Sequence, residues 1–378
     1  MAFTFKLIIQ LFFTMMLAAV LTPLIKLLAF QIGAVDMPNK RRINTKAMPT
    51  AGGLAIFLAF SLSVMWEFRH VLFESNVLPI LLGTLIVVIT GLIDDVRELS
   101  PSQKLIGITF AALEIYYVAN IRINTMSIPF FGMIHLGWLS LPITILWILA
   151  ITNAVNLIDG LDGLAAGVSM IALTTIGIVS YFFLPDNGVF ISIMIFTLVA
   201  AIMGFFPFNF HPAAIFLGDT GALMLGFLIS VFSLQGLKNV TFISVLTPMF
   251  ILGVPITDTI YAMLRRLFNR QPISSPDKMH LHHRLISLGF SHRGAVMTIY
   301  ALATIFSFIA LLMNYASKTA VVLLVAMTTF GLELFIELIG LVGENRQPLL
   351  HFLKFFGNRH FRQEVLEKMA QKRKHKKK

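Results

Sequence analysis

The residues best suited to chemistry in this sequence are carboxylates that stand where long apolar stretches end. Asp94 and Asp95 close one such stretch, in the string Gly-Leu-Ile-Asp-Asp-Val-Arg. Two adjacent carboxylates at the C-terminal end of a helix oppose the helix dipole and each other, at a cost of about 0.3–1 kcal/mol each. An ordinary solvated helix end would accept them at that cost, but the pairing favours a function in a site.

Further carboxylates and amides follow in two later strings. Asn156, Asp159 and Asp162 lie in Asn-Leu-Ile-Asp-Gly-Leu-Asp-Gly, and their spacing of three would place them on one face of a helical backbone. The alternative is a Gly-rich turn whose aspartates cap a helix. Asn209 and Asp219 lie in Asn-Phe-His-Pro-Ala-Ala-Ile-Phe-Leu-Gly-Asp-Thr-Gly. Asp219 could also be a simple helix cap, although the acidic groups elsewhere favour a shared site.

Histidines gather in a later polar segment, where His280, His282 and His283 precede Arg284. This segment could be a basic cluster at the membrane interface or a metal site. Zinc sites usually add a carboxylate or a stiffer ligand spacing, so zinc is the weaker interpretation. Asp258 lies apart from the other acids, inside an apolar stretch two helical turns before an arginine, and could simply pair with that arginine.

Several carboxylates in a chain without cysteine suit a hard, oxygen-preferring ion such as Mg²⁺ or Mn²⁺. Mg²⁺ is typically held by one or two carboxylates and completes its shell with water and substrate phosphates. Cations elsewhere in the chain suit a diphosphate; they are Lys46, Lys104, the three histidines and Arg284. Together these groups indicate phosphoryl transfer, in which catalysis is mostly positioning and charge stabilisation.

The elements that must position these groups are membrane helices. Apolar residues make up 57% of the 378 positions and charged residues 12%, against about 25% charged residues in soluble domains. The apolar residues form continuous blocks close to the about 20 residues that cross a bilayer as a helix, not the alternating segments of a barrel. We predict an all-α, polytopic membrane protein of about eleven transmembrane helices. Because the phosphoryl transfer would then take place at a membrane, one substrate is expected to be a lipid phosphate. The predicted spans are 3–30, 51–66, 78–93, 105–119, 139–155, 164–184, 189–206, 214–235, 241–263, 294–314 and 319–342.

Lysines and arginines determine the predicted orientation, because short cytoplasmic loops carry an excess of them. They cluster after the first span at 40–46, after the ninth at 265–293, and at the C-terminus at 372–378. We therefore expect the N-terminus outside, the C-terminus in the cytoplasm, and the acidic junctions, hence the active site, at the cytoplasmic face. Residues 1–345 should form one integral membrane domain, and 346–378 a basic tail that contacts anionic membrane lipids rather than nucleic acid.

These motifs, in this order, resemble those of the polyprenyl-phosphate N-acetylhexosamine-1-phosphate transferases, from about residue 33 to about residue 290. The resemblance rests on the Asp-Asp pair, Asn-x-x-Asp-Gly-x-Asp-Gly-Leu, Phe-Leu-Gly-Asp-Thr-Gly, His-x-His-His, and Lys-Ala-Met-Pro-Thr-Ala-Gly-Gly beginning at Lys46. The muramyl-pentapeptide branch typically has three consecutive histidines, whereas Leu281 interrupts them here. The pattern is similar to the branch that uses UDP-GlcNAc to initiate teichoic acid, O-antigen or other wall polysaccharides.

The resemblance implies a bacterial plasma-membrane enzyme that transfers GlcNAc-1-phosphate from UDP-GlcNAc to undecaprenyl phosphate and releases UMP. A homodimer is compatible with the family. Asp219 would ligate Mg²⁺, or Mn²⁺, and Asp94 or Asp95 would act on the lipid phosphate, with Asp159, His282 and His283 completing the catalytic group. The implied substrate-binding residues are Lys46, Gly160, Leu161, Asp162 and Phe216 around the uridine, and Asn156, Asn209, His280 and Arg284 around the diphosphate and sugar.

The lipid phosphate needs little help from a base. A phosphate monoester has a second pKa of about 6, so undecaprenyl phosphate is largely dianionic at neutral pH. This favours direct attack on the β-phosphorus of UDP-GlcNAc over a two-step route through an aspartyl-phosphate, which the sequence leaves open.

Two other interpretations of the chain are the same reaction with UDP-MurNAc-pentapeptide or UDP-GalNAc, and an ion-coupled transporter. A transporter should carry its acids near the bilayer midplane. In the predicted topology most of them lie at junctions on one side of the membrane, which favours the enzyme.

Overall fold

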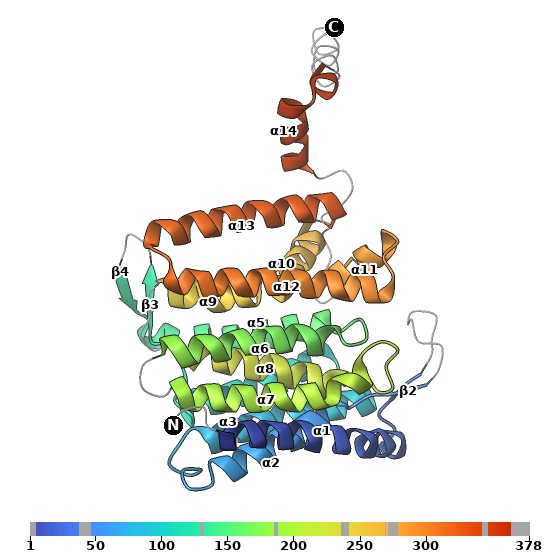
Figure 1. Ribbon diagram of the computed structural model, residues 1–378, viewed down its shortest axis with the longest axis vertical. Helices are drawn as coiled ribbons and strands as arrows, with labels where there is room; N and C mark the ends of the chain where they lie inside the picture. Colours follow the sequence, from blue (N-terminus) through green and yellow to red (C-terminus); the bar gives the residue numbers. More distant parts are fainter. Residues whose placement is uncertain are drawn as a thin grey trace. The chain divides into compact units, whose positions relative to one another are not determined.

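Helices make up nearly all of the regular structure, as the apolar blocks predict (Figure 1). The computed structural model describes residues 5–37, 47–128, 132–184, 188–235, 242–268, 270, 279–341 and 347–363. The helices are α1 (Phe5–Ile32), α2 (Gly53–Glu67), α3 (Val77–Arg97), α4 (Pro101–Tyr117), α5 (Ser140–Ile158), α6 (Leu164–Phe183), α7 (Gly188–Asn209), α8 (Gly218–Gln235), α9 (Phe242–Ile251), α10 (Gly253–Phe268), α11 (Leu281–Ser287), α12 (His292–Tyr315), α13 (Lys318–Ile339) and α14 (Pro348–Gly357). The other described elements are two antiparallel hairpins, β1 (Val35–Asp36) with β2 (Met48–Pro49) and β3 (Thr125–Ile128) with β4 (Gly132–His135), and the 3-10 helix η1 (Gly137–Leu139).

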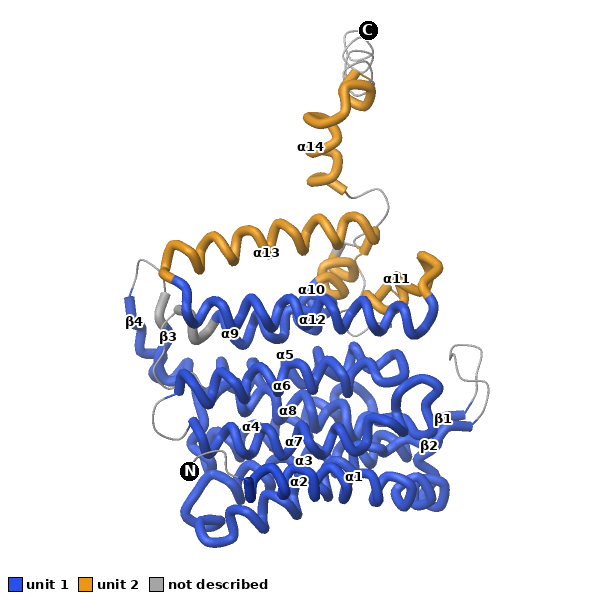
Figure 2. The backbone as a smooth tube through the Cα atoms, viewed as in Figure 1, with its two compact units in different colours: residues 1–260, 291–316 blue, residues 261–290, 317–378 orange. Residues whose placement is uncertain are grey.

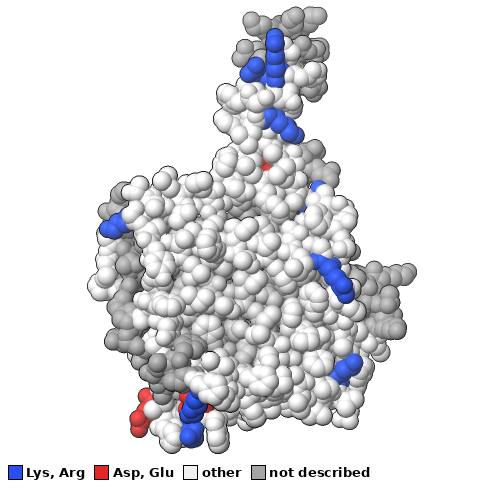
Figure 3. Space-filling model, viewed as in Figure 1, with Lys and Arg blue, Asp and Glu red and all other residues white. Residues whose placement is uncertain are grey.

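Eight of the described helical segments are long and apolar enough to cross a membrane, and the chain is a polytopic membrane protein. They are α1, α3, η1 with α5, α6, α7, α8, α12 and α13. The remaining predicted blocks coincide with the shorter helices α2, α4, α9 and α10, so the count of about eleven spans stays a prediction. On the face seen in Figure 3, the described side chains over α1, α6, α7 and α12 are almost all uncharged, as contact with lipid requires.

The ninth predicted span, 241–263, is not one continuous helix. α9 ends at Ile251 and α10 begins at Gly253. Pro255 has no N–H to donate to the carbonyl of Ile251 four residues earlier, and Gly253 weakens the preference for a continuous helix. The predicted span 241–263 thus coincides with two consecutive helices separated by Leu252, and its crossing of the membrane stays a prediction.

The chain forms two compact units (Figure 2). The first holds residues 1–260 and 291–316, and the second holds residues 261–290 and 317–378. The proposed boundary between a membrane domain and a basic tail at 345–346, like residues 364–378 of that tail, lies outside the described residues.

α8 is the central helix of the first unit. Its side chains are buried from Thr220 to Gln235, and α3, α5, α2 and α6 pack against it. A helix that is apolar all round is stable only inside such a surround. The N-terminal end of α8 is therefore held in place by its neighbours.

α3 meets the start of α8 at a glycine. A Cβ built on Gly91 would lie 2.6 Å from the backbone nitrogen of Thr220 and from the carbonyl oxygen of Asp219. The missing side chain lets the two backbones touch, and so brings the end of α3, with Asp94 and Asp95, beside Asp219.

We expect Gly91→Ala to force α3 and α8 apart and to lower the free energy of unfolding by about 1–3 kcal/mol, the usual effect of overpacking. Thermal unfolding of the detergent-solubilised protein measures this change. Gly331→Ala in α13 is the matched control, because a Cβ there meets no atom within 4 Å. That variant should be as stable as the parent or gain up to about 1 kcal/mol from the better helix former. Equal unfolding temperatures for the two variants would contradict the close contact.

Candidate active site

α3 and α4 join at a corner that the Asp94 side chain helps to build. Glu98 adopts the left-handed conformation, with φ of 49°, and its N–H bonds to the Asp94 carbonyl at 2.8 Å. The Leu99 N–H donates to Asp94 Oδ1 at 2.6 Å. Ser100 then caps α4 through a capping box. The corner thus reverses the chain and brings Lys104 of α4 back to Asp94.

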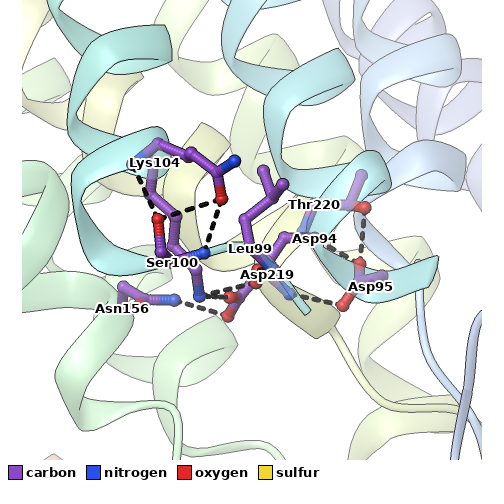
Figure 4. A network of polar contacts seen from close by, with 9 residues as sticks. Asp94, Asp95, Leu99, Ser100, Lys104, Asn156, Asp219 and Thr220 are labelled. Atoms are coloured by element: carbon purple, nitrogen blue, oxygen red, sulfur yellow. Dashed lines mark hydrogen bonds and ion pairs between the residues drawn. The ribbon is translucent and has the colours of Figure 1, made fainter. Parts of the chain in front are cut away.

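Lys104 lies between two carboxylates that are far apart in the sequence (Figure 4). Its Nζ is 2.6 Å from Asp94 Oδ2 and also contacts Asp219 Oδ2. From the other side, the Asn156 amide donates to Asp219 Oδ1 at 2.7 Å. Side chains from the ends of α3, α4, α5 and α8 therefore form one carboxylate–lysine cluster, defined here as Asp94, Asp95, Lys104, Asn156 and Asp219.

Asp95 faces a different partner from its neighbour Asp94. Its carboxylate accepts from the Asp219 N–H at 2.9 Å, from the Thr220 N–H at 3.0 Å and from the Thr220 hydroxyl at 2.6 Å. Asp95 of α3 is therefore the N-terminal cap of α8, where a carboxylate also suits the helix dipole. Gly218 has φ of +72°, and a Cβ there would lie 2.6 Å from Asp95 Oδ2, so this turn needs glycine.

The loop after α5 does not continue the helix, so the expected single helical face for its three polar residues is wrong. α5 ends at Ile158, and only Asn156 of the three is helical. Asp159 follows in a Gly-rich turn, as in the alternative interpretation, but no aspartate side chain caps α6, whose N-cap is Gly163. Removal of its carboxyl from water raises the pKa of Asp159 well above its usual range, and the neighbouring carboxylates of Asp219 and Asp95 raise it further.

The residues expected around the uridine lie in several segments. Gly160 is exposed and Leu161 is buried. Phe216 is held by its backbone, which donates to the Pro49 carbonyl at 2.9 Å and accepts from the Gly52 N–H at 3.0 Å. Asp162 bonds to His211. Lys46 lies outside the described residues.

Asn209 is buried, and its amide donates to the Ile215 carbonyl at 3.1 Å. This hydrogen bond joins the end of α7 to the part of the loop just before α8. None of the described hydrogen bonds joins Asn209 to the carboxylate–lysine cluster.

The expected histidine group belongs to the second unit. His280 precedes α11 and is buried, as is His282. The rings of His282 and His283 lie with centroids 4.2 Å apart. The Arg284 guanidinium donates to the Ile339 carbonyl at the end of α13, so this arginine has a structural partner within its own unit.

Several residues that contact the site residues in the structure were not singled out from the sequence. Lys104 was expected only as one of many cations, and the capping box at Ser100 was the local signal that α4 starts close enough to bring it back. Thr220, His211 and His292 were not selected. Each acts through a partner distant in the sequence, and no local pattern reveals such a contact.

The carboxylate–lysine cluster has the donors that a hard divalent cation prefers. Asp94 and Asp219 supply carboxylate oxygens, and the side-chain amide of Asn156 lies beside them. Burial raises the pKa of Asp159, and the carboxylates of Asp219 and Asp95 lie near enough to raise it further. A second group of possible ligands, Asp162, His211 and His292, has its ligand atoms within 4.8 Å of one another.

Buried carboxylates with a bridging lysine at the ends of membrane helices indicate a polytopic membrane enzyme that handles phosphate groups. The family model for glycosyl transferase family 4 matches residues 77–237. The chain is 40% identical to the probable undecaprenyl-phosphate N-acetylglucosaminyl 1-phosphate transferase of Bacillus subtilis, over 92% of this chain and 96% of that protein. It therefore belongs to glycosyl transferase family 4.

Two further relatives are more distant. The decaprenyl-phosphate N-acetylglucosaminephosphotransferase of Mycolicibacterium smegmatis is 32% identical over 75% of this chain and 76% of its own. The phospho-N-acetylmuramoyl-pentapeptide-transferase of Halalkalibacterium halodurans is 30% identical over 81% of this chain and 95% of its own.

We expect Asp95→Ala to lower the free energy of unfolding by about 1–2 kcal/mol, because α8 loses its cap. Asp95→Asn keeps one acceptor oxygen and should lose less. Thermal unfolding in detergent distinguishes the two variants, and Glu74→Ala, at an exposed carboxylate, controls for loss of charge. If Asp95→Ala unfolded at the same temperature as Glu74→Ala, the capping role would be wrong.

Proposed function

We propose that the protein transfers GlcNAc-1-phosphate from UDP-GlcNAc to undecaprenyl phosphate, giving undecaprenyl-diphospho-GlcNAc and UMP. The carboxylate–lysine cluster carries this proposal, because it combines ligands for a cation with an ammonium group for a phosphate. The named activity of the Bacillus subtilis relative, at 40% identity over 92% of the chain, supports the choice of sugar and lipid. The lipid product would be the first membrane intermediate of a cell-envelope polysaccharide.

Mg²⁺ is the proposed cofactor, with Mn²⁺ as a substitute, and Asp219 is its proposed ligand. When bound, the ion would neutralise charge on the donor diphosphate. Asn156 hydrogen-bonds to Asp219, and Asp159 lies near enough for the Asp219 charge to affect it. Both residues would help to position the ion and the diphosphate. Lys104 would then move its ammonium from Asp219 toward a phosphate oxygen, while Asp94 keeps its other contact.

The nucleophile is an oxygen of the lipid phosphate. It forms a bond to the β-phosphorus of UDP-GlcNAc, the bond from that phosphorus to the bridging oxygen breaks, and UMP leaves with the electron pair. Because Asp95 already accepts three hydrogen bonds from α8, Asp94 is the better placed of the pair to act on the lipid phosphate, and it would do so through the Lys104 ammonium that it holds.

Hydrogen bonding also favours this direct route over an aspartyl-phosphate. Asp94 Oδ1 holds the Leu99 N–H, and its Oδ2 holds Lys104. Asp219 engages Asn156 and Lys104 through its two oxygens. Carboxylates that are used in this way are weaker nucleophiles than a dianionic lipid phosphate.

The uridine would lie by Gly160, Leu161, Asp162 and Phe216 with Lys46, and the sugar phosphate by His280, His282, His283 and Arg284. Asn209 would support this site by shaping the α7–α8 loop. The positions of lysines and arginines support a cytoplasmic active site in a bacterial plasma membrane.

The defining assay follows radiolabel from UDP-GlcNAc into undecaprenyl phosphate in detergent. We expect transfer that stops with EDTA and falls by about 100-fold or more in Asp219→Asn, because the proposed ligand is lost. Glu74→Gln, an exposed carboxylate of the same unit, should transfer label normally. Label that enters lipid only from UDP-MurNAc-pentapeptide would replace the donor, and full activity of Asp219→Asn would overturn the metal ligand.

Lys104 offers a separate test. Lys104→Met removes the ammonium from between two carboxylates and should lower kcat by about 10²–10³-fold. Lys104→Arg keeps the charge but not its compact geometry, so it should retain more activity than the methionine variant. Steady-state kinetics at saturating Mg²⁺ measure both. Similar kcat values for Lys104→Met and the parent protein would exclude Lys104 from the reaction.

A further inference from the structure

A second polar cluster of the first unit fixes Asp162, one residue of the proposed uridine site. His211 lies between α7 and α8, and its Nδ1 is 2.7 Å from Asp162 Oδ2. Since an ionised carboxylate can only accept, His211 is the donor. The Ala213 N–H donates to the same oxygen at 3.2 Å. Neither contact reaches Asp162 Oδ1, and no hydrogen bond among the described residues uses that oxygen.

The first residue of α12 supports His211. The rings of His292 and His211 stack, with centroids 4.1 Å apart and an interplanar angle of 18°. The Arg293 guanidinium donates to the His211 carbonyl at 3.0 Å. His211 is therefore held on its ring face and on its backbone by α12, a helix that lies outside residues 77–237 of the family match.

α12 also holds the loop of Asp162 directly. About two turns further along the helix, the Tyr300 hydroxyl donates to the Gly163 carbonyl at 2.5 Å. A Cβ on Gly167 would lie 2.1 Å from the Tyr300 ring, so the ring packs closely against the start of α6. Asp162 is thus fixed at its side chain by His211 and at its following backbone by Tyr300.

The distances favour hydrogen bonding over a metal centre at this cluster. A zinc ion lies about 2.0–2.2 Å from each of its ligands, and ligands at tetrahedral angles are then separated by more than a hydrogen bond. His211 Nδ1 and Asp162 Oδ2 are 2.7 Å apart, the length of a charge-assisted N–H···O bond. The two imidazoles also stack face to face.

We propose that His211, held by His292, is a positioning residue that fixes the Asp162 carboxylate so that Oδ1 accepts a hydrogen bond from the nucleoside of the donor. The inference rests on the proposed function only in taking a uridine nucleotide as the ligand. Uracil carries an N–H at position 3, whereas cytosine has an acceptor there. A fixed carboxylate oxygen would therefore favour UMP over CMP.

The test is the binding of UMP and CMP to the purified full-length protein by titration calorimetry, with steady-state kinetics beside it. His211→Leu should weaken UMP binding and raise the KM for UDP-GlcNAc by about tenfold, with the KM for undecaprenyl phosphate and the affinity for CMP unchanged. His211→Asn carries an amide N–H where Nδ1 stands and should restore UMP affinity to within about twofold. His135→Leu, at an exposed histidine of the same unit, is the matched control.

His292 has its own pair of variants. His292→Phe keeps a stacking ring and should bind UMP like the parent protein, whereas His292→Ala should lose part of the UMP affinity without changing the affinity for CMP. If His211→Leu cannot be recovered folded, His211→Gln replaces it, since its amide reaches the place of Nε2 and should not restore the contact to Asp162.

Several outcomes would overturn the inference. They are unchanged UMP affinity in His211→Leu, equal losses for UMP and CMP, an equal rise in the KM for lipid, and failure of the wild-type protein to bind UMP. One zinc ion per chain, lost in His211→Asn, would replace the positioning role with a metal site. UMP binding with the expected pattern, in a protein that transfers no GlcNAc-1-phosphate, would uphold this inference and reject only the proposed function.

Discussion

Carboxylates repel one another, and this protein gathers several of them at the ends of membrane helices, where the low dielectric strengthens that repulsion. The Lys104 ammonium between Asp94 and Asp219 is the compensation on which the arrangement depends. It requires α4 to return immediately beside α3, which the corner at Glu98 and the cap at Ser100 provide. It also requires α8 to start beside α3, which Gly91 permits and Asp95 stabilises.

The same arrangement explains why the adjacent residues Asp94 and Asp95 have different hydrogen-bond partners. Asp95 satisfies the backbone at the N-terminus of the buried helix α8, so it holds Asp219 in place through the chain itself. Asp94 instead pairs with the Lys104 ammonium. In this account the protein supplies charge and geometry, the lipid phosphate supplies the nucleophile, and no protein group needs to be covalently modified.

The helices and the polar junctions could be predicted from the sequence, because the apolar blocks have bilayer length and the acids interrupt them. The division of 241–263 at Gly253 and the end of α5 at Ile158 could have been read from local glycines and a proline. The Lys104 bridge and the His211 contact with Asp162 could not. They join residues separated by 115 and 49 positions, and only the packing of α8 and α12 against their neighbours brings them together.

The exchange of labelled UMP into UDP-GlcNAc, with and without undecaprenyl phosphate, tests most directly whether the lipid phosphate is the nucleophile. The account predicts exchange by the wild-type protein only when the lipid is present, because the sugar phosphate has no other acceptor. Exchange by a lipid-free preparation would mean that the protein itself carries the sugar phosphate, and would contradict a direct displacement.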